Sequence, residues 1–401
     1  LSKGSTNLNR NYKILWITFL ISNFGDWLRK LALPLLVFEK TGSSFHMASL
    51  YGISFLPWIT FSLVGGVLAD KYKKTSIISL GHLISLLFLG LLIAAFNGEQ
   101  LFLPLLYLLT FLLSSIEPLI HPAFQSLLPQ IVEIKSLTRA NSGLQLIDNT
   151  LNLIGPMISG IVLILFPPLN SLWINALTFL VAGLVILRID SRVNQMKDKK
   201  DSLSQTIKLG FAEVKKNKVI LCGSLLFFGT NFGIHLFQAN LVYYITDILG
   251  YSAFHYGVIL SMGGVGSVLG SIISPKIISK FNYGKIISVC TIFAGVATIC
   301  ISLYSNYIYI GSLLGVSTFF GNINAITYFT LRQKMIKQEM LGRVISITRM
   351  ISYASIPLGA YLGGILVNYG SSIFIIILIA GSIRFFVGIL GFLSPLGQNS
   401  F

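Results

Sequence analysis

The sequence predicts an all-α integral membrane protein with twelve transmembrane helices, and two features of the chain support this. Of the 401 residues, 54% are hydrophobic and only 10% are charged, and the mean hydropathy is +0.80. These values lie outside the range of ordinary soluble domains. In addition, apolar runs of about 20 residues, enough to cross about 30 Å of hydrocarbon as helices, recur from end to end.

Short polar breaks separate twelve such runs, each of which is expected to be one membrane span. The first run is too long for the core of a signal peptide and no small-residue cleavage site follows it, so it is expected to remain as a helix. The expected spans are 13–38, 46–69, 76–96, 101–127, 141–166, 171–188, 219–246, 255–279, 285–305, 307–331, 343–367 and 371–394.

The formal net charge of +16 does not indicate a nucleic-acid partner, because of how the charge is distributed. With the N-terminus placed inside, nearly all of the 29 Lys and Arg fall on or beside cytoplasmic segments. Only Lys40 falls outside, while Arg29, Lys30 and Arg384 lie within spans. This is the positive-inside pattern. It predicts a multi-pass membrane protein with both termini in the cytoplasm.

Cofactor and metal chemistry are not expected. Cys222, Cys290 and Cys300 are isolated on apolar runs without the spacing of a metal site, and we interpret them as packing residues. The chain has no phosphate-binding loop of the GxxxxGK type, so ATP is not the expected energy source. No nucleophile and base stand together as in an enzyme.

Six spans precede the longest polar segment, "RIDSRVNQMKDKKDSLSQTIKLGFAEVKKNK", and six follow it. This divides the chain into an N-terminal six-helix bundle (1–188), a cytoplasmic linker (189–218) and a C-terminal six-helix bundle (219–401). Ile207, Phe211 and Val214 share one helical face in the linker, which fits either an amphipathic helix on anionic lipid or a solvated connection.

The two halves contain similar stretches in corresponding spans. "LVGGVLADKYKK" ends the second span and "VGSVLGSIISPKIISK" the eighth, while "IGPMISGIV" in the fifth corresponds to "IPLGAYLGGIL" in the eleventh. Parallel repeats with a site between them near the midplane are typical of secondary transporters with alternating access. The expected fold is therefore two pseudo-symmetric bundles around a central site.

Over essentially its whole length, the chain resembles the major facilitator superfamily. "GGVLADKYKK" is similar to the family's loop between spans two and three, G-x-x-x-D-[RK]-x-G-[RK]-[RK], although Lys73 replaces the later glycine. The resemblance implies a conformational latch, in which the glycine allows close helix contact and the aspartate pairs with a base or caps a helix. The residues carried over are Gly66, Asp70, Lys71 and Lys74.

A second motif, "GPMISG", resembles the fifth-span motif of antiporter branches, G-P-x-x-G-G, with Ser159 in place of the first paired glycine. Gly155, Pro156 and Gly160 would kink and thin this helix, and ordinary close packing is the alternative.

Two further stretches narrow the branch. "HPAFQSLLPQIVEIKSLTRANSGLQLIDNTLNLIGP" and "GDWLRKLALPLLVFEKTGS" are similar to the macrolide-efflux and siderophore-exporter group, of the drug:H⁺ antiporter type, and lysophospholipid flippases share similar segments. Many antiporters of the family carry an arginine near the middle of the fourth span. Here Ser114, Ser115 and Glu117 stand in that region, so a mechanism that uses such an arginine is not expected.

An ionised side chain in the bilayer centre costs about 3 kcal/mol on insertion scales, so buried charges are candidates for function. Asp26 is followed by Arg29 at i+3, on the same face of the first span. Two interpretations stay open, a structural ion pair or a protonation site that faces the cavity. Glu117 and His121, one turn apart in the fourth span, are a second candidate for a proton path, or else a helix-end hydrogen bond.

The second half has no embedded Asp or Glu and offers amides, rings and one arginine. This division predicts a titratable first half and a second half that orients the substrate. The expected lining of the substrate cavity is Tyr51, Trp58, Asn231, His235, Gln238, Asn324, Tyr328 and Arg384.

Together with the resemblance, on which the substrate class rests, these features predict a secondary exporter of an amphipathic small molecule in the bacterial cytoplasmic (inner) membrane, driven by exchange for protons and active as a monomer in the lipid bilayer. A siderophore or metallophore is the first expectation for the substrate and a macrolide-like drug the second. The alternatives are a lysophospholipid transporter of the same family and, from another class, a membrane receptor or scaffold that transports nothing.

Overall fold

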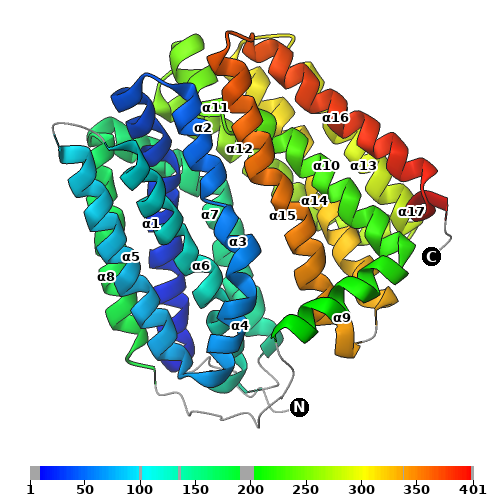
Figure 1. Ribbon diagram of the computed structural model, residues 1–401, viewed down its shortest axis with the longest axis horizontal. Helices are drawn as coiled ribbons and strands as arrows, with labels where there is room; N and C mark the ends of the chain where they lie inside the picture. The colour runs from blue at the N-terminus through cyan, green and yellow to red at the C-terminus, as the bar shows by residue number, and fades with distance from the viewer. Residues whose placement is uncertain (1–9, 99–101, 134–136, 190–202, 337, 399–401) are drawn as a thin grey trace, which may run out of the picture.

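The computed structural model describes residues 10–98, 102–133, 137–189, 203–336 and 338–398, and the elements in this part of the chain are helical. The spans of the first half are α1 (Arg10–Thr41), α2 (Ser44–Ile53), α3 (Leu56–Thr60), α4 (Ser62–Lys71), α5 (Lys74–Asn97), α6 (Leu103–Ile131), α7 (Leu137–Leu165) and α8 (Pro168–Ile186). α2, α3 and α4 together form the second span. The prediction of an all-helical membrane protein is confirmed (Figure 1).

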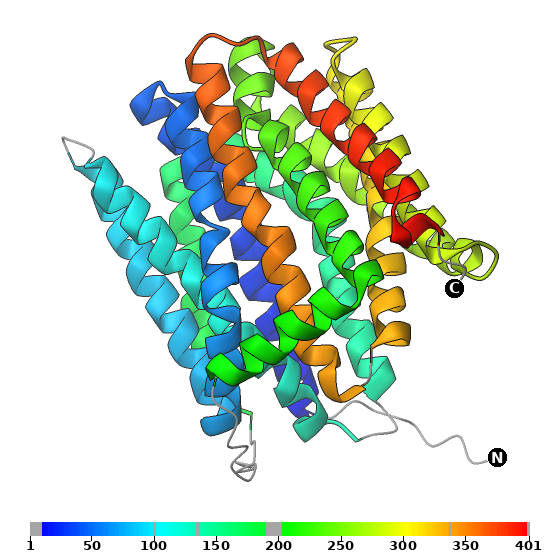
Figure 2. The same ribbon diagram turned by 45° about the vertical axis from the view of Figure 1, so that its right-hand side comes forward.

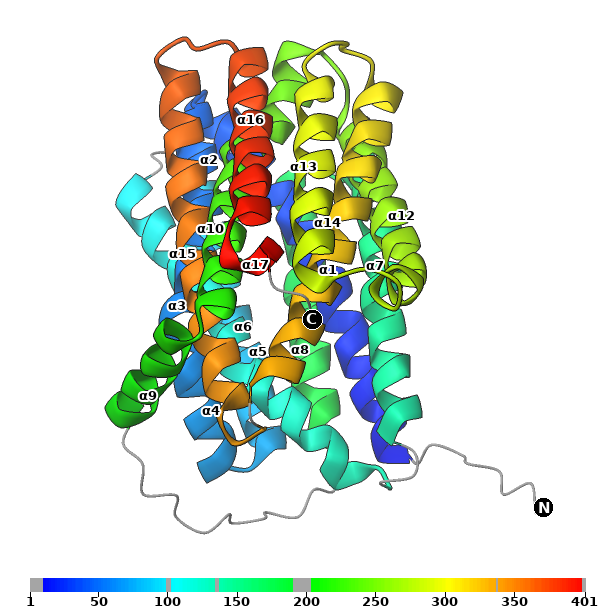
Figure 3. The same ribbon diagram turned by 90° about the vertical axis from the view of Figure 1, so that its right-hand side faces the viewer.

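The second half repeats this arrangement after the linker helix α9 (Leu203–Lys216). Its elements are α10 (Lys218–Gln238), α11 (Leu241–Tyr243), the π-helix η2 (Tyr244–Ile248), α12 (Ala253–Ile278), α13 (Tyr283–Ile301), α14 (Tyr307–Met335), α15 (Gln338–Asn368), α16 (Ile373–Leu393) and α17 (Pro395–Gln398). Seen from the outer side of this half, α13 and α16 lie side by side (Figure 3).

Within the described residues, nine helices are long and apolar enough to cross a membrane on their own. The three remaining spans deviate for identifiable reasons. α1 carries Asp26, Arg29 and Lys30, the second span is interrupted twice, and α14 is rich in Tyr, Thr and Asn. At 1.5 Å per residue, α1 is about 48 Å long and therefore extends beyond the hydrocarbon on both sides.

Local sequence signals set where several helices begin and end. Asn217, Asn282 and Asn306 are the N-caps of α10, α13 and α14, and each side-chain oxygen accepts a backbone N–H of the first turn. Gly42 and Gly370 follow the ends of α1 and α15 with φ of +61° and +80°, a conformation that other residues rarely adopt. Short loops can therefore join antiparallel neighbours.

Alternate ends of the spans gather on two opposite faces of the bundle. One face is where α1, α5 and α13 begin, and we call it the basic face because Lys and Arg residues gather there. These residues are Arg10, Lys13, Lys73, Lys74, Lys276, Lys280 and Lys285. The other, where α1 and α15 end, is called the opposite face. α9 crosses the basic face next to α15 (Figure 2). Val214 of α9 is buried against Ile220, Val344 and Ile347, so this part of the linker packs on the protein, while the side chain of Ile207 lies outside the described residues.

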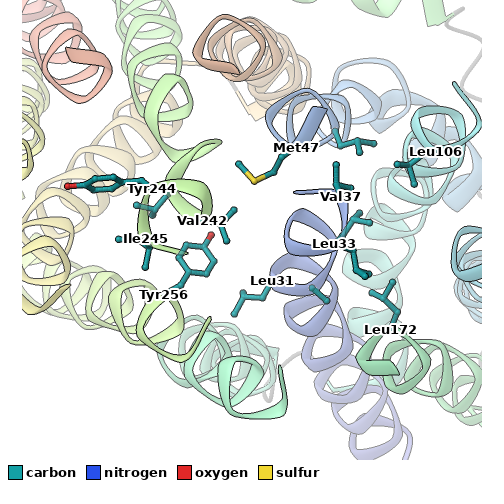
Figure 4. Packing of buried hydrophobic residues seen from close by; sticks show 14 of the residues in the cluster. Leu31, Leu33, Val37, Met47, Leu106, Leu172, Val242, Tyr244, Ile245 and Tyr256 are labelled. Carbon is teal, nitrogen blue, oxygen red and sulfur yellow. The ribbon is translucent and has the colours of Figure 1, made fainter. Parts of the chain in front are cut away.

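The two halves meet between the middle of the bundle and the opposite face. There α2 packs on α15, and α7 packs on α12. One cluster of buried apolar residues spans both halves, with Leu31 and Met47 facing Val242 and Tyr256 (Figure 4). Toward the basic face the ribbons of the two halves diverge (Figure 1).

Candidate substrate cavity

A central cavity of about 480 Å³ lies between the halves, and both halves contribute to its lining. Six aromatic residues form much of its wall, and charged or polar side chains interrupt this wall on α1, α6 and α10. The aromatic residues are Trp27, Tyr51, Phe55, Trp58, Tyr256 and Tyr353, and the main polar ones are Arg29, Lys30, Glu117, His235 and Gln238. An apolar wall with a few convergent polar groups is the usual form of a small-molecule site.

The charge in this cavity comes mainly from one turn of α1. Arg29 Nη2 donates a hydrogen bond to Asp26 Oδ1 at 3.0 Å, so the predicted ion pair is formed. Lys30 Nζ lies 4.9 Å from the centroid of the Trp27 ring. Among the described residues, no carboxylate lies within 4.0 Å of the Lys30 ammonium. Lys30, which the set of expected site residues did not include, therefore presents a cation to the cavity.

A smaller cavity of about 60 Å³ lies inside the first half, behind the central one. Asp26, Arg29, Glu117 and His121 all line it. The structure thus brings together the four residues predicted for proton coupling, although they come from two helices and two separate motifs. Arg29 and Glu117 line both cavities, so they stand where the two spaces meet.

His82 of α5 also lines this small cavity and was missed from the sequence. It is 3% exposed, and its ring stacks on Phe179 with centroids 5.9 Å apart. Neither ring nitrogen has a hydrogen-bond partner among the described residues. The one signal in the sequence was a histidine in an otherwise apolar third span. Whether this histidine lies at the same depth as Asp26 depends on how α5 packs, which the sequence of the span does not show.

A third cavity, of about 310 Å³, lies within the second half. Asn231, Gln238, Asn324 and Arg384 line it together with hydroxyl side chains. The expected substrate lining is therefore divided. Tyr51, Trp58 and His235 line the central cavity and Asn231, Asn324 and Arg384 the third one, while Gln238 lines both.

Tyr328 was expected to line a cavity, and the structure places it elsewhere. It is 3% exposed, its hydroxyl donates to the Ile220 carbonyl at 2.9 Å, and it shares a second hydrogen bond with Ser224. Its ring stacks on Phe227 with centroids 4.9 Å apart. The residue joins α14 to α10 near the basic face, so this expectation was wrong.

One hydrogen bond joins the halves at the wall of the central cavity. The Tyr51 hydroxyl and His235 Nδ1 are 3.0 Å apart. Nearby, the Trp58 ring contacts Tyr353 of the second half and His121 of the first, with centroids 6.4 and 5.6 Å apart. Aromatic residues of the second span thus bridge the two halves directly.

The predicted latch motif is only partly described. The side chains of Asp70 and Lys71 lie outside the described residues, and Lys74 begins α5. Gly66 was expected to allow close helix contact, yet a methyl group added there would meet nothing within 4 Å. The close contact falls on Gly65, where an added Cβ would lie 2.5 Å from the Pro118 carbonyl oxygen. The assignment to Gly66 is therefore wrong for this conformation.

The fifth-span motif lies at the interface between the halves. A Cβ added at Gly160 would lie 3.1 Å from the Ala253 carbonyl oxygen, and Pro156 presents its own carbonyl to Gly257 of α12. Gly155 lies against the Trp27 ring. Small residues at these positions let α7 approach α12 and α1 closely.

Comparison with known proteins places this arrangement in a family. The model of the Major Facilitator Superfamily matches residues 15–360. The staphyloferrin A transporter of Staphylococcus aureus is 22% identical over 346 residues, with 84% of this chain and 85% of the relative covered. Macrolide efflux protein A of Streptococcus pyogenes is 25% identical over 387 residues, with 90% of each covered.

The solved structures agree at the level of the fold. The crystal structure of a point mutant of the nucleoside transporter NupG superposes with a TM-score of 0.81, covering 96% of this chain and 99% of the other at 12% identity. The family match spans most of the chain, and its helical arrangement is that of known transporters. The chain therefore belongs to the Major Facilitator Superfamily.

Proposed function

We propose that the protein is a secondary exporter that moves an amphipathic small molecule out of the cell in exchange for protons. The observation that carries this proposal is the central cavity, which both halves line and which combines an aromatic wall with Arg29, Lys30 and Glu117. A wall of rings suits the apolar body of an amphipathic compound, and the charged groups suit its polar end.

The contacts between the halves support alternating access. The halves meet toward the opposite face and diverge toward the basic face. If the basic face is cytoplasmic, as the positive-inside rule predicts, this conformation faces inward. Export then requires that α2 separates from α15 and that α7 separates from α12. The 65–74 motif is the proposed latch of the conformation that is open at the opposite face.

Proton exchange is assigned to the first half. Asp26 and Glu117 line one small cavity with His121, and Glu117 also faces the central cavity. The charged groups that act on Glu117 include Lys30, Asp26 and Arg29. A carboxylate in such a setting can exchange a proton when a charged substrate arrives or when water access changes, which couples the two movements.

For the substrate, a siderophore or metallophore remains the first candidate, and the named staphyloferrin A transporter among the relatives favours it. A macrolide-like drug is second, favoured by the relative named for macrolide efflux. A lysophospholipid is the alternative within the family. A receptor or scaffold would bind a ligand in the same cavity without moving it.

The test uses inside-out vesicles that contain the protein and an acidic interior. Radiolabelled staphyloferrin A, erythromycin and a lysophospholipid are added separately, and accumulation is measured with and without a protonophore. We expect one of the three to accumulate only while the pH gradient lasts, and its addition to release protons from the vesicles. Binding with no accumulation in any of these arms would favour the receptor and contradict export.

Orientation is tested by single cysteines in a background without Cys222, Cys290 and Cys300. Positions 98, 169 and 370 should react with an impermeant thiol reagent added outside whole cells, because they lie at or beside the ends of α5, α8 and α15 on the opposite face. Positions 73, 200 and 338 should not react until the cells are opened. The reverse pattern would overturn the assignment of the basic face to the cytoplasm.

A further inference from the structure

Arg384 is a buried cation in the third cavity. It lies midway along α16, is 3% exposed, and lines the space of about 310 Å³ within the second half. An arginine placed this deep in a membrane protein is costly unless its charge is balanced.

The neighbours of Arg384 satisfy hydrogen bonds but do not balance its charge. Its Nη1 donates to Thr298 Oγ1 at 2.6 Å and to Ser317 Oγ at 2.8 Å, and both acceptors are neutral hydroxyls. Its Nε has no hydrogen-bond partner among the described residues. No carboxylate lies within 4.0 Å of the guanidinium in the same part of the chain.

The sequence of the surrounding helices explains why an internal counter-ion is missing. α10, α12, α13, α14 and α16 contain no Asp or Glu at all. Any balancing negative charge in this cavity must therefore come from another molecule, because the walls cannot supply one.

The walls are suited to such a molecule. Asn231 and Asn324 add amides to the lining, and each uses one amide N–H within the protein, on the Ser352 carbonyl and the Thr291 hydroxyl, which leaves a second N–H that can donate to an anion. The Thr291 and Thr318 hydroxyls already donate to the Ile287 and Gly263 carbonyls. Gly233 leaves room for the arginine, since a Cβ added there would lie 2.9 Å from Arg384 Cγ. A guanidinium with amide donors in the same cavity is a strong setting for a carboxylate or a halide.

We propose that the third cavity is a binding site for a small monovalent anion, held against the guanidinium of Arg384. Two sources fit this chemistry. One is the carboxylate of a larger substrate that reaches from the central cavity past Gln238, which lines both spaces. The other is a free halide ion. The proposal does not depend on export, because binding can be measured on the protein at rest.

The experiment follows thermal unfolding of the full chain in lipid nanodiscs, in a buffer whose only anion is the bulky sulfonate of HEPES. Sodium chloride or sodium acetate is titrated at constant ionic strength. We expect a saturable rise of the unfolding midpoint of about 3 °C, as for a ligand that binds only the folded state. A response to chloride assigns the site to a free halide, and a response to acetate alone assigns it to a carboxylate group.

Variants separate the site from general salt effects. Arg384→Met should abolish the response, whereas Arg332→Met should keep it, because Arg332 stacks on Tyr328 at 4.6 Å and bonds to Thr348 outside the third cavity. If Arg384→Met does not fold, the double variant Thr298→Val with Ser317→Ala is used instead. This variant keeps the charge of Arg384 but removes the two hydroxyl groups that hold its guanidinium in position. It should weaken the apparent affinity about tenfold.

Three results would overturn the proposal. The first is the absence of any response of the unmodified protein to either anion. The second is a response of Arg384→Met equal to that of the unmodified protein. The third is an unchanged affinity in the double variant.

Discussion

The inner cavities of the two halves differ in size and in chemistry, although the halves share one fold. The cavity of the first half is about 60 Å³ and holds two carboxylates, two imidazoles and one arginine. That of the second half is about 310 Å³ and holds one arginine among amides and hydroxyls. The difference teaches that pseudo-symmetry in the backbone does not extend to the side chains, and it is the basis for proposing a different ion for each half.

The change expected to have the largest effect is at Asp26. Asp26→Asn keeps the shape of the side chain but removes the charge that faces Arg29 at 3.0 Å and the group proposed to carry the proton. We expect it to abolish export driven by a pH gradient while substrate binding persists. Folded yield, binding and gradient-driven export are measured in the same vesicles.

The double variant Asp26→Asn with Arg29→Gln separates coupling from structure. A lone Arg29 is an uncompensated buried charge, so a fall in yield of the single variant should be reversed when the arginine is also removed. If export returns with the yield, Asp26 is structural and does not carry the exchanged proton.

The second change sharpens the same comparison at Glu117. Glu117→Gln should slow gradient-driven export about 100-fold, the lower end of what a proton-transfer group contributes, because this residue stands between the two cavities. Glu133→Gln is the matched control, since Glu133 is exposed and follows the end of α6. Equal rates for both variants would remove Glu117 from the proton path.

The smallest effect is expected at the contact between the halves. Tyr51→Phe removes the hydrogen bond to His235, worth about 1 kcal/mol, which corresponds to about a fivefold shift toward the conformation open at the opposite face. The measurement is the rate at which a cysteine at position 47 reacts with an impermeant reagent from that side. Tyr328→Phe, which loses the hydrogen bonds to Ile220 and Ser224 within the second half, should leave this rate unchanged.

Much of the fold was predictable because hydrophobicity acts locally. The twelve apolar runs correspond to the observed spans, and errors fall at the ends. For example, the run 13–38 became α1, Arg10–Thr41, because the helix continues through the interface until Gly42 reverses the chain. Hydropathy predicts which residues lie in the hydrocarbon, but it does not predict how far a helix continues beyond it.

The site was predictable where it depends on spacing within one helix. Asp26 and Arg29 are three residues apart, so their contact follows from helix geometry alone. Tyr328 and Asn324 also share a face, yet Asn324 lines a cavity while Tyr328 packs on α10 one turn nearer the basic face. How far a cavity extends along a helix depends on the neighbouring helices, which no single segment encodes. For the same reason, the position of His82 in the small cavity of the first half could not be predicted from the sequence.

The interruptions of the second span bear on how the molecule bends. α2 packs on α15 in the other half, whereas α4 packs on α6 in its own, so the two ends of one span are attached to different bodies. Between them Pro57 lacks a backbone N–H, and regular α-helix stops before Leu56 and again at Phe61. A helix broken in this way flexes more easily than a continuous one. If the halves rock against each other as proposed, we expect the second span to be the joint that bends.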